Sequence, residues 1–466
     1  MTSCCGDSNR DVASPSGCKP EVDETDPELS KPLCNVNQSL PIVVIGAGPV
    51  GLAAAANLVQ YQQDFLVLEA GPRVAASMSG WRHVRLFTPW SYLIAPAGRR
   101  LLERQGDWSE PDADRVPFAG ELIDGYLDPL SRVPDIAAKI KLNHKVISVS
   151  SEGHDLMKDG RRDEAPFLIV VDSPDGPKRF RARAVVDASG TWTNPNPLGS
   201  GGIPADGEQQ AQDRIQYGMP DILGGDRDRY AGKRVLVVGS GHSATGNVLH
   251  LLKLADDFPA TQIAWGIRRR NPAKLWGGGS DDEIAARGQL GTLAKEAVDQ
   301  GHVTLLTGLS VVALHRRESG LEIIDVDGRS RIEVDEIIVA SGARPDLAML
   351  RELRLEFDPA TEATKTLGPL IDPNQHHCGS VPPHGAAELR HPESGFYLAG
   401  MKSYGRAPTF LLVTGYEQVR SIVAELSGDH EAARNVELVL PATGVCSLDL
   451  CEQEDDCGPA ESCRQR

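Results

Sequence analysis

Short, continuous apolar runs stand out along this chain, and two of them share one continuation. Residues 42–45 lead into GAGPVG at 46–51 and then into an Ala-rich segment. Residues 235–238 lead into GSGHSA at 239–244 and then into apolar residues at helical spacing. Buried parallel strands read as such solid apolar runs, and a glycine turn links each strand to its helix. The pattern therefore predicts the same strand–turn–helix unit twice.

Three more apolar runs end in small residues. Residues 184–187 precede Ala-Ser-Gly, residues 336–339 precede a second Ala-Ser-Gly, and residues 395–400 end in glycine. The first two follow the glycine turns at the distance expected for the closing strand of each sheet. A helix is expected from Thr409 to Glu425. Together these elements predict an α/β fold with two Rossmann-like dinucleotide-binding domains, the second inserted into the first.

The polar and apolar segments divide the chain into five parts. Residues 1–39 and 431–466 lack hydrophobic periodicity and are predicted to be disordered, Cys-containing tails. Residues 41–215 are the predicted first part of the first domain, 216–345 the second domain, and 346–430 the return of the first. No apolar run reaches the roughly 18–20 residues that cross a bilayer, so no membrane span is expected.

Composition and charge narrow the possible partners. With 40% hydrophobic and 24% charged residues, the 466-residue chain has the make-up of an ordinary globular protein. Its formal net charge of −17 disfavours binding to nucleic acid or to anionic membranes. The N-terminal residues lack the apolar stretch of a signal peptide, which favours a cytoplasmic location. A small-molecule substrate is the expected partner, and the oligomeric state stays open.

The first glycine turn has the chemistry of a dinucleotide site. Gly46 permits a tight turn, Gly48 lets the backbone approach a pyrophosphate, and Gly51 lets the helix pack on the strand. The helix N-terminus offers N–H groups and positive potential to the phosphates. The next apolar run, residues 65–68, ends at Glu69, whose carboxylate can accept hydrogen bonds from a ribose diol.

The second glycine turn repeats this arrangement, with alanine permitted at the third position. The residues expected at the second nucleotide are Gly239, Gly241, His242, Ser243 and Ala244. The following strand, predicted at residues 262–267, ends not in an acid but in three arginines. Arginine suits the 2′-phosphate of NADP, so NADPH is favoured over NADH. Arg268 and Arg269 are the first choices for that contact, and a solvated strand end is the other interpretation.

Small residues at the ends of the closing strands fit the same interpretation. Ser189, Gly190, Gly342 and Gly400 let the chain cross closely over a bound nucleotide. Each strand taken alone is also compatible with ordinary packing of a strand on a helix. The N-terminus of the predicted helix, beside Pro408, could stabilise negative charge on a reduced flavin.

Cysteine is confined almost entirely to the two tails. Cys4, Cys5, Cys18 and Cys34 precede the first strand, Cys446, Cys451, Cys457 and Cys463 lie near the C-terminus, and Cys378 follows His376 and His377 in a loop. Soft thiolates bind soft ions, and trivalent arsenic shares that preference. We hypothesise that Cys4, Cys5, Cys446, Cys451, Cys457 and Cys463 capture a metalloid or a thiol adduct. Zinc binding, thiol exchange and a dispensable tail are the other interpretations; no firm metal site is predicted.

The order of these motifs resembles the flavoproteins that have two dinucleotide-binding domains. Within them the chain is most similar to flavin-containing monooxygenases, and particularly to those encoded beside bacterial arsenic-resistance genes. The resemblance covers roughly residues 41–426 and implies FAD at the first turn and NADPH at the second. It also places the segment Gly80-Trp81-Arg82 near the flavin, so that the flavin-side candidates are Trp81, Arg82, Arg85 and Thr88.

Two departures from the family pattern affect the expected chemistry. The histidine-containing signature of many monooxygenases has no counterpart before the second turn, where residues 217–235 contain no histidine. The last strand ends Ala-Gly-Met401, where many relatives have Gly-Asp, so the acid that holds the flavin ribityl chain is missing or supplied elsewhere. Disulfide reductases need a cysteine pair beside the flavin, and residues 46–377 contain no cysteine.

The expected function is an NADPH-dependent FAD monooxygenase. Reaction of the reduced flavin with O2 would form a C4a-hydroperoxide that oxygenates a small soft nucleophile, namely an arsenical or a sulfur or nitrogen compound. One alternative is an NADPH-dependent oxidoreductase that passes electrons to a quinone, a carrier or a metalloid without inserting oxygen. A second alternative is a metalloid-binding or redox-sensing flavoprotein that acts through its tails.

Overall fold

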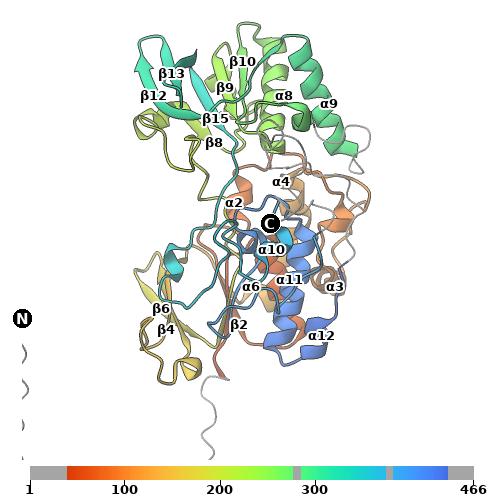
Figure 1. The fold of residues 1–466 in the computed structure, drawn as a ribbon. Coiled ribbons are helices and arrows are strands. Elements are labelled where there is room, and N and C mark those ends of the chain that lie inside the picture. The colour runs from red at the N-terminus through yellow and green to blue at the C-terminus, as the bar shows by residue number, and fades with distance from the viewer. Residues whose placement is uncertain (1–38, 277–284, 374–380, 439–466) are drawn as a thin grey trace, which may run out of the picture.

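Two five-stranded parallel sheets form the frame of the protein (Figure 1). The computed structural model describes residues 39–276, 285–373 and 381–438. The first sheet has the order β16-β7-β1-β2-β3. Its strands are β1 (Ile42–Ile45), β2 (Phe65–Leu68), β3 (Ile140–Lys141), β7 (Ala184–Asp187) and β16 (Phe396–Leu398).

The second sheet has the order β11-β10-β9-β15-β8 and lies in the upper lobe of Figure 1. Its strands are β8 (Ile215–Tyr217), β9 (Arg234–Val238), β10 (Gln262–Gly266), β11 (Val303–Leu306) and β15 (Glu336–Val339). Because β16 returns to the first sheet after the second is complete, the second unit is inserted into the first. The predicted α/β fold with two Rossmann-like units is confirmed.

Helices cover one face of each sheet. In the lower lobe, α1 (Pro49–Gln60) packs against α3 (Pro96–Gln105) and α11 (Leu412–Leu426). Four consecutive alanines in α1 are fully buried, and such small side chains let neighbouring helices approach closely. In the upper lobe, α8 (His242–Asp257) and α9 (Ala285–Asp299) lie together beside the sheet.

A three-stranded antiparallel sheet covers the opposite face of each parallel sheet. The first comprises β4 (Lys145–Ser151), β5 (Phe167–Asp172) and β6 (Lys178–Ala182), and the second comprises β12 (Val311–Arg317), β13 (Gly320–Asp325) and β14 (Ser330–Val334). Alternate residues of β1 serve the two faces: Ile42 and Val44 belong to the helical core, while Val43 and Ile45 pack toward the antiparallel sheet. Solid apolar strands are thus buried on both sides.

Shorter elements complete the chain. The short helices are α2 (Ala76–Ser79), α4 (Ala119–Leu122), α5 (Asp128–Ser131), α6 (Pro134–Ala137), α7 (Arg227–Tyr230), α10 (Gly368–Ile371) and α12 (His430–Arg434). A π-helical segment spans Ile123–Leu127, and 3-10 turns span Trp90–Tyr92, Arg162–Glu164, Gln209–Arg214, Ala273–Trp276, Ala348–Leu350 and Gly400–Tyr404. Among the described residues, no helix combines the length and apolarity that crossing a bilayer requires.

Three element boundaries differ from the sequence-based expectation. The predicted change of domain between 215 and 216 falls inside β8, and Leu198 already packs in the core of the upper sheet. The helix predicted from Thr409 begins instead at Leu412, because Leu411 has an extended backbone and lines the cavity. The predicted tail from 431 includes part of α12, which α11 holds through a hydrogen bond from Ser421 Oγ to the Ala433 carbonyl.

Candidate cofactor and active site

A cavity of about 940 Å³ lies along the C-terminal ends of the strands in both sheets. Ligands of open α/β sheets bind at this edge, where strand ends and helix N-termini meet. The cavity brings together most of the predicted site residues: Gly46, Gly48, Glu69, Trp81, Thr88, Ser189, Gly190, Gly241, His242, Ser243, Arg269, Gly342 and Gly400. Residues from both lobes therefore line one chamber.

The first glycine turn is tightly packed on one side and open on the other. Gly46 has a φ of +96°, and a Cβ there would lie 2.9 Å from the Ala188 carbonyl oxygen. A Cβ on Gly51 would lie 1.9 Å from the Gly46 carbonyl oxygen, so only glycine fits. No described atom lies within 4 Å of a Cβ built on Gly48, which leaves its backbone open to the cavity. This geometry fits a pyrophosphate.

Glu69 supports the first turn from the end of β2. Its carboxylate accepts hydrogen bonds from the Ala47 N–H at 2.7 Å and from the Gly71 N–H at 2.8 Å. Only 8% of the residue is exposed, yet it lines the cavity. Each carboxylate oxygen has more than one lone pair, so the side chain can hold the loop and also accept from a ribose diol.

The second glycine turn is more exposed. Gly239 has a φ of +140°, and a Cβ there would lie 2.3 Å from the Ala340 carbonyl oxygen. Gly241 and His242 are exposed at the start of α8. The His242 ring lies 5.0 Å from that of Phe87, which comes from the lower lobe. The two lobes therefore meet beside the second nucleotide turn.

The arginines after β10 take different positions. Arg269 lines the cavity. Arg268 is exposed, and its guanidinium lies 3.4 Å from the Ser200 carbonyl oxygen that it donates to. Arg269 is thus the better placed of the two for a ligand in the cavity.

Some predicted residues do not reach the cavity. Gly51, Gly239 and Ala244 pack behind the turns, where they determine how closely each helix approaches its strand. Arg82 and Arg85, proposed from the sequence as flavin-side residues, are exposed and absent from the lining. The Arg82 guanidinium donates to Asp124 at 2.7 Å instead, because an exposed carboxylate lies within its reach. Both residues lie outside the cavity lining, and their flavin-side role stays a prediction.

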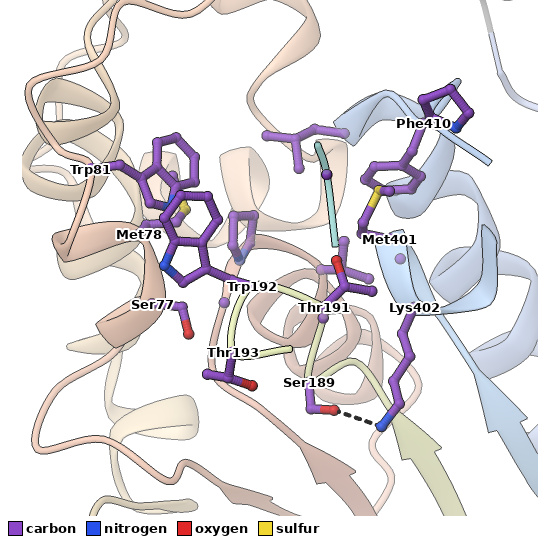
Figure 2. A pocket seen from close by; sticks show the side chains of 18 of the residues that line it. Ser77, Met78, Trp81, Ser189, Thr191, Trp192, Thr193, Met401, Lys402 and Phe410 are labelled. Atoms are coloured by element: carbon purple, nitrogen blue, oxygen red, sulfur yellow. Dashed lines mark hydrogen bonds between the residues drawn. The ribbon is translucent and has the colours of Figure 1, made fainter. Parts of the chain in front are cut away.

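Apolar side chains line two opposite sides of the cavity. The Trp81 and Trp192 rings lie 5.7 Å apart, with Met78 close by (Figure 2). Met401 and Phe410 come from the opposite side of the pocket in the same view. These five residues, which we call the thioether–aromatic wall, are all uncharged.

Two buried polar clusters at the end of β16 were not predicted as part of the site. Lys402 Nζ lies 2.7 Å from Asp187 Oδ2 and 3.1 Å from Ser189 Oγ (Figure 2). Gln418 Oε1 accepts from the Gly400 N–H at 2.7 Å, and its amide nitrogen reaches His384 at 3.0 Å. The sequence offered one signal for the first of these clusters. Asp187 is a charged residue at the end of a solid apolar strand.

Proton positions in the second cluster follow from the hydrogen-bond partners. The Pro382 carbonyl can only accept, so His384 Nδ1 carries the proton, and its Nε2 accepts from the Gln418 amide. The same amide donates to Ser403 Oγ at 2.9 Å. Burial lowers the pKa of His384 below its ordinary value and so favours this neutral ring.

The predicted metalloid ligands Cys4, Cys5, Cys446, Cys451, Cys457 and Cys463 lie outside the described residues, as does the His376-His377-Cys378 loop. The described ranges contain no cysteine. Within those ranges, no group of three or more His, Cys, Asp or Glu side chains could hold a metal ion.

Comparison with known proteins identifies the class. The pyridine nucleotide-disulphide oxidoreductase family matches residues 40–364, well over half of the chain, and the chain belongs to this family. No curated protein is similar enough to match. The chain therefore belongs to a class of flavin-dependent oxidoreductases that use a pyridine nucleotide.

Solved structures of several activities share this fold at low identity. The bacillithiol disulfide reductase Bdr (YpdA) from Bacillus cereus has 18% identity and a TM-score of 0.62, covering 84% of this chain and 99% of that one. The cadaverine monooxygenase DfoA from Erwinia amylovora, bound to FAD, has 14% identity and a TM-score of 0.60, covering 87% and 99%. The flavin-containing monooxygenase from Stenotrophomonas maltophilia has 19% identity and a TM-score of 0.54, covering 84% and 98%.

Proposed function

We propose that this enzyme is an FAD- and NADPH-dependent monooxygenase that oxygenates a small soft nucleophile, such as an arsenical or a sulfur or nitrogen compound. One observation carries the proposal: both glycine turns open into one cavity, and no residue of the described ranges is a cysteine. A disulfide reductase needs a cysteine pair beside its flavin. Electrons from NADPH therefore have no protein disulfide in the described part of the site, which favours a small molecule as acceptor.

Bound FAD and NADPH supply the redox chemistry: two electrons from NADPH reduce O2, one oxygen atom enters the substrate, and the other leaves as water. The chain's own residues bind and orient these groups. The first turn, with Glu69 behind it, fits the FAD pyrophosphate and ribose, and Arg269 fits the NADPH 2′-phosphate.

The thioether–aromatic wall supports an uncharged, soft substrate. Met78 is buried, and it lies beside the Trp81 and Trp192 rings (Figure 2). Apolar side chains bind a charged substrate poorly because its desolvation is not compensated. Thioether sulfur is polarizable and adapts to soft atoms such as arsenic or sulfur. The wall also limits the water that reaches the reacting atoms.

Isotope labelling tests the proposal. The purified full-length enzyme is supplied with NADPH and oxygen-18 gas, together with arsenite, a dialkyl sulfide or a tertiary amine in separate reactions. Oxygenation predicts one oxygen-18 atom in the product and one NADPH consumed for each product formed. Product without the label, or NADPH consumption with no oxygenated product from any of the three, contradicts the proposal.

A second candidate is an oxidoreductase that passes electrons to a quinone, a carrier or a metalloid without inserting oxygen. The absence of a histidine from residues 217–235, where many monooxygenases carry their signature, favours it. Its test is anaerobic: sustained NADPH oxidation that depends on an added quinone or metalloid, with no O2 present, supports this candidate.

The tails offer a third candidate, a metalloid-binding or redox-sensing role. In the cytoplasm their thiols would stay reduced and available to soft ions. The matched variants lack residues 1–38 or 445–466. A lower affinity for arsenite in either variant, with unchanged FAD content, supports capture by that tail, and equal affinity in both rejects it.

A further inference from the structure

Lys402 is the most deeply buried positive charge on the cavity wall. Its side chain is 2% exposed and that of its partner Asp187 is 0% exposed. Lys402 lines the cavity, whereas Asp187 lies behind it. A buried ion pair pays a large desolvation cost, so it contributes little net stability unless further hydrogen bonds compensate it. The pair therefore calls for an explanation other than general stability.

The position of Lys402 points to the FAD chain. Strands β16, β7 and β1 are neighbours in the first sheet, and Asp187 pairs in register with both Ile45 and Leu398. The segments that follow these three strands therefore lie side by side. A Cβ on Gly46 would meet the backbone of Ala188 and Ser189. Lys402 and Ser189 thus stand next to the turn that fits the pyrophosphate.

The ammonium has hydrogen-bonding capacity directed at this site. It has three N–H donors. Among the described residues, its hydrogen-bond partners are Asp187 Oδ2 and Ser189 Oγ. The other carboxylate oxygen, Asp187 Oδ1, accepts from the Ser189 N–H at 3.0 Å. Asp187 therefore holds both Lys402 and the Ser189 backbone, and one ammonium N–H is available to the cavity.

We propose that Lys402 is an FAD-binding residue, whose buried ammonium, compensated and positioned by Asp187, donates to an oxygen of the ribityl–pyrophosphate chain. Ser189 Oγ stands beside it at the same edge. Lys402 follows the glycine of the last strand by two residues, so the end of β16 carries it to this edge of the sheet. This contact concerns FAD binding alone and does not depend on what the reduced enzyme reacts with.

The test measures the affinity of the apoprotein for FAD by quenching of flavin fluorescence. Lys402→Met alone would leave Asp187 as an uncompensated buried charge, so the informative variant is the neutral pair Asp187→Asn/Lys402→Met. A hydrogen bond from a charged donor predicts a Kd for FAD that is about 10-fold to 100-fold weaker. Lys402→Arg, which keeps charge and donors, is expected to lie between wild type and this variant.

A second buried ion pair in the same lobe provides the matched control. The side chains of Arg162 and Glu393 are 4% and 6% exposed, their closest contact is 2.9 Å, and neither lines the cavity. Arg162 also donates to the Asp155 and Glu352 carbonyls at 2.7 and 2.9 Å, so Arg162→Met/Glu393→Gln should lower the unfolding midpoint of the apoprotein and leave the Kd for FAD within about twofold. A loss of FAD affinity confined to the Lys402 variant separates binding from general stability.

Two further outcomes complete the test. ADP titration of the same apoproteins locates the contact: equal losses for ADP and FAD assign it to the pyrophosphate, while a loss for FAD alone assigns it to the ribityl chain. The proposal is overturned if Asp187→Asn/Lys402→Met binds FAD within twofold of wild type. It is also overturned if the Arg162 control loses FAD affinity to the same degree.

Discussion

The two glycine turns follow the same sequence pattern, but the structure builds them differently. At the first turn, a Cβ added to Gly51 would lie 1.9 Å from the Gly46 carbonyl oxygen. Nine of the 12 residues of α1 are buried. At the second, Ala244 takes the equivalent place, and six of the 16 residues of α8 are buried. The first helix is thus pressed onto its strand inside the core, whereas the second lies near the surface.

The residues that end the next strands differ in the same direction. Glu69 is buried and fixed by two backbone N–H groups, while Arg268 is exposed. Gly241 and His242 are exposed at the second turn, and Gly46 and Gly48 are half-buried at the first. An enclosed, preorganised turn suits a group that stays bound, since the protein is already ordered around it. An open turn suits a nucleotide that exchanges in every catalytic cycle.

The largest expected effect comes from filling the first turn. Gly51→Val places a side chain against backbone that cannot move without shifting α1 from its strand. We expect a loss of more than about 3 kcal/mol in the free energy of unfolding and loss of bound FAD. Unfolding midpoints and FAD content per protein check this.

The matched variant at the second turn is Ala244→Gly. It removes a methyl group and adds helix flexibility, which costs about 1 kcal/mol in the free energy of unfolding. The FAD content should not change, because Ala244 lies in α8 of the other lobe. A Gly51→Val protein that retains stoichiometric FAD would show that the packing contrast between the turns has no bearing on cofactor retention.

A smaller effect is expected at Glu69. Glu69→Ala leaves the buried Ala47 N–H without its acceptor and removes the carboxylate that faces the cavity. One buried donor left unsatisfied costs about 1–3 kcal/mol, which predicts a Kd for FAD roughly 10-fold to 100-fold weaker. Titration of the apoprotein measures it. Glu69→Gln keeps one acceptor and should lose less; equal affinities for wild type and Glu69→Ala would contradict the assigned role.

The sequence predicted the parallel frame well because that information is local. The run at 42–45 matches β1, 184–187 matches β7, and 235–238 falls within β9. Solid apolar runs between glycine turns identify buried parallel strands without any knowledge of distant contacts. The cofactor turns were located for the same reason.

The remaining parts of the site depend on contacts between distant residues. Lys402 and Asp187 are far apart in the sequence, and neither residue carries a periodic signal that links it to the other. Arg82 and Arg85 lie outside the cavity lining, and the motif could not indicate this because it gives the position of a segment but not the direction of its side chains. The antiparallel sheets were missed because their strands alternate exposed with buried residues and so form no solid apolar run, as in β6.

At the second turn, we expect substitution of Arg269 to change the preference between NADPH and NADH. Arg269→Ala removes the arginine that lines the cavity, so we expect kcat/KM for NADPH to fall about 10-fold, with little change for NADH. Arg268→Ala is the matched variant and should have a smaller effect, because Arg268 is exposed and donates toward Ser200. Steady-state rates with both nucleotides check this. An equal fall for NADPH and NADH in Arg269→Ala would exclude a 2′-phosphate contact.

The last expected effect is a gradual loss of stability in acid that arises in the FAD-side lobe. His391 is buried, and its Nδ1 accepts a hydrogen bond from the Glu356 N–H. Burial lowers the pKa of His391 to about 4. As the pH falls below about 6.5, the unfolded chain gains a proton there that the folded chain does not, so stability decreases until about pH 4. The expected loss is about 1.4 kcal/mol per pH unit in this range.

His391→Gln removes this titration and keeps an acceptor for the Glu356 N–H, so its unfolding midpoint should fall less between pH 6.5 and pH 5 than that of wild type. His302→Gln, at an exposed position in the other lobe, is the matched substitution. Chemical denaturation at several pH values measures both slopes. If His391→Gln shows the same slope as wild type and His302→Gln, the acid sensitivity does not come from the buried histidine. The contrast between the two lobes would then not include a difference in their stability in acid.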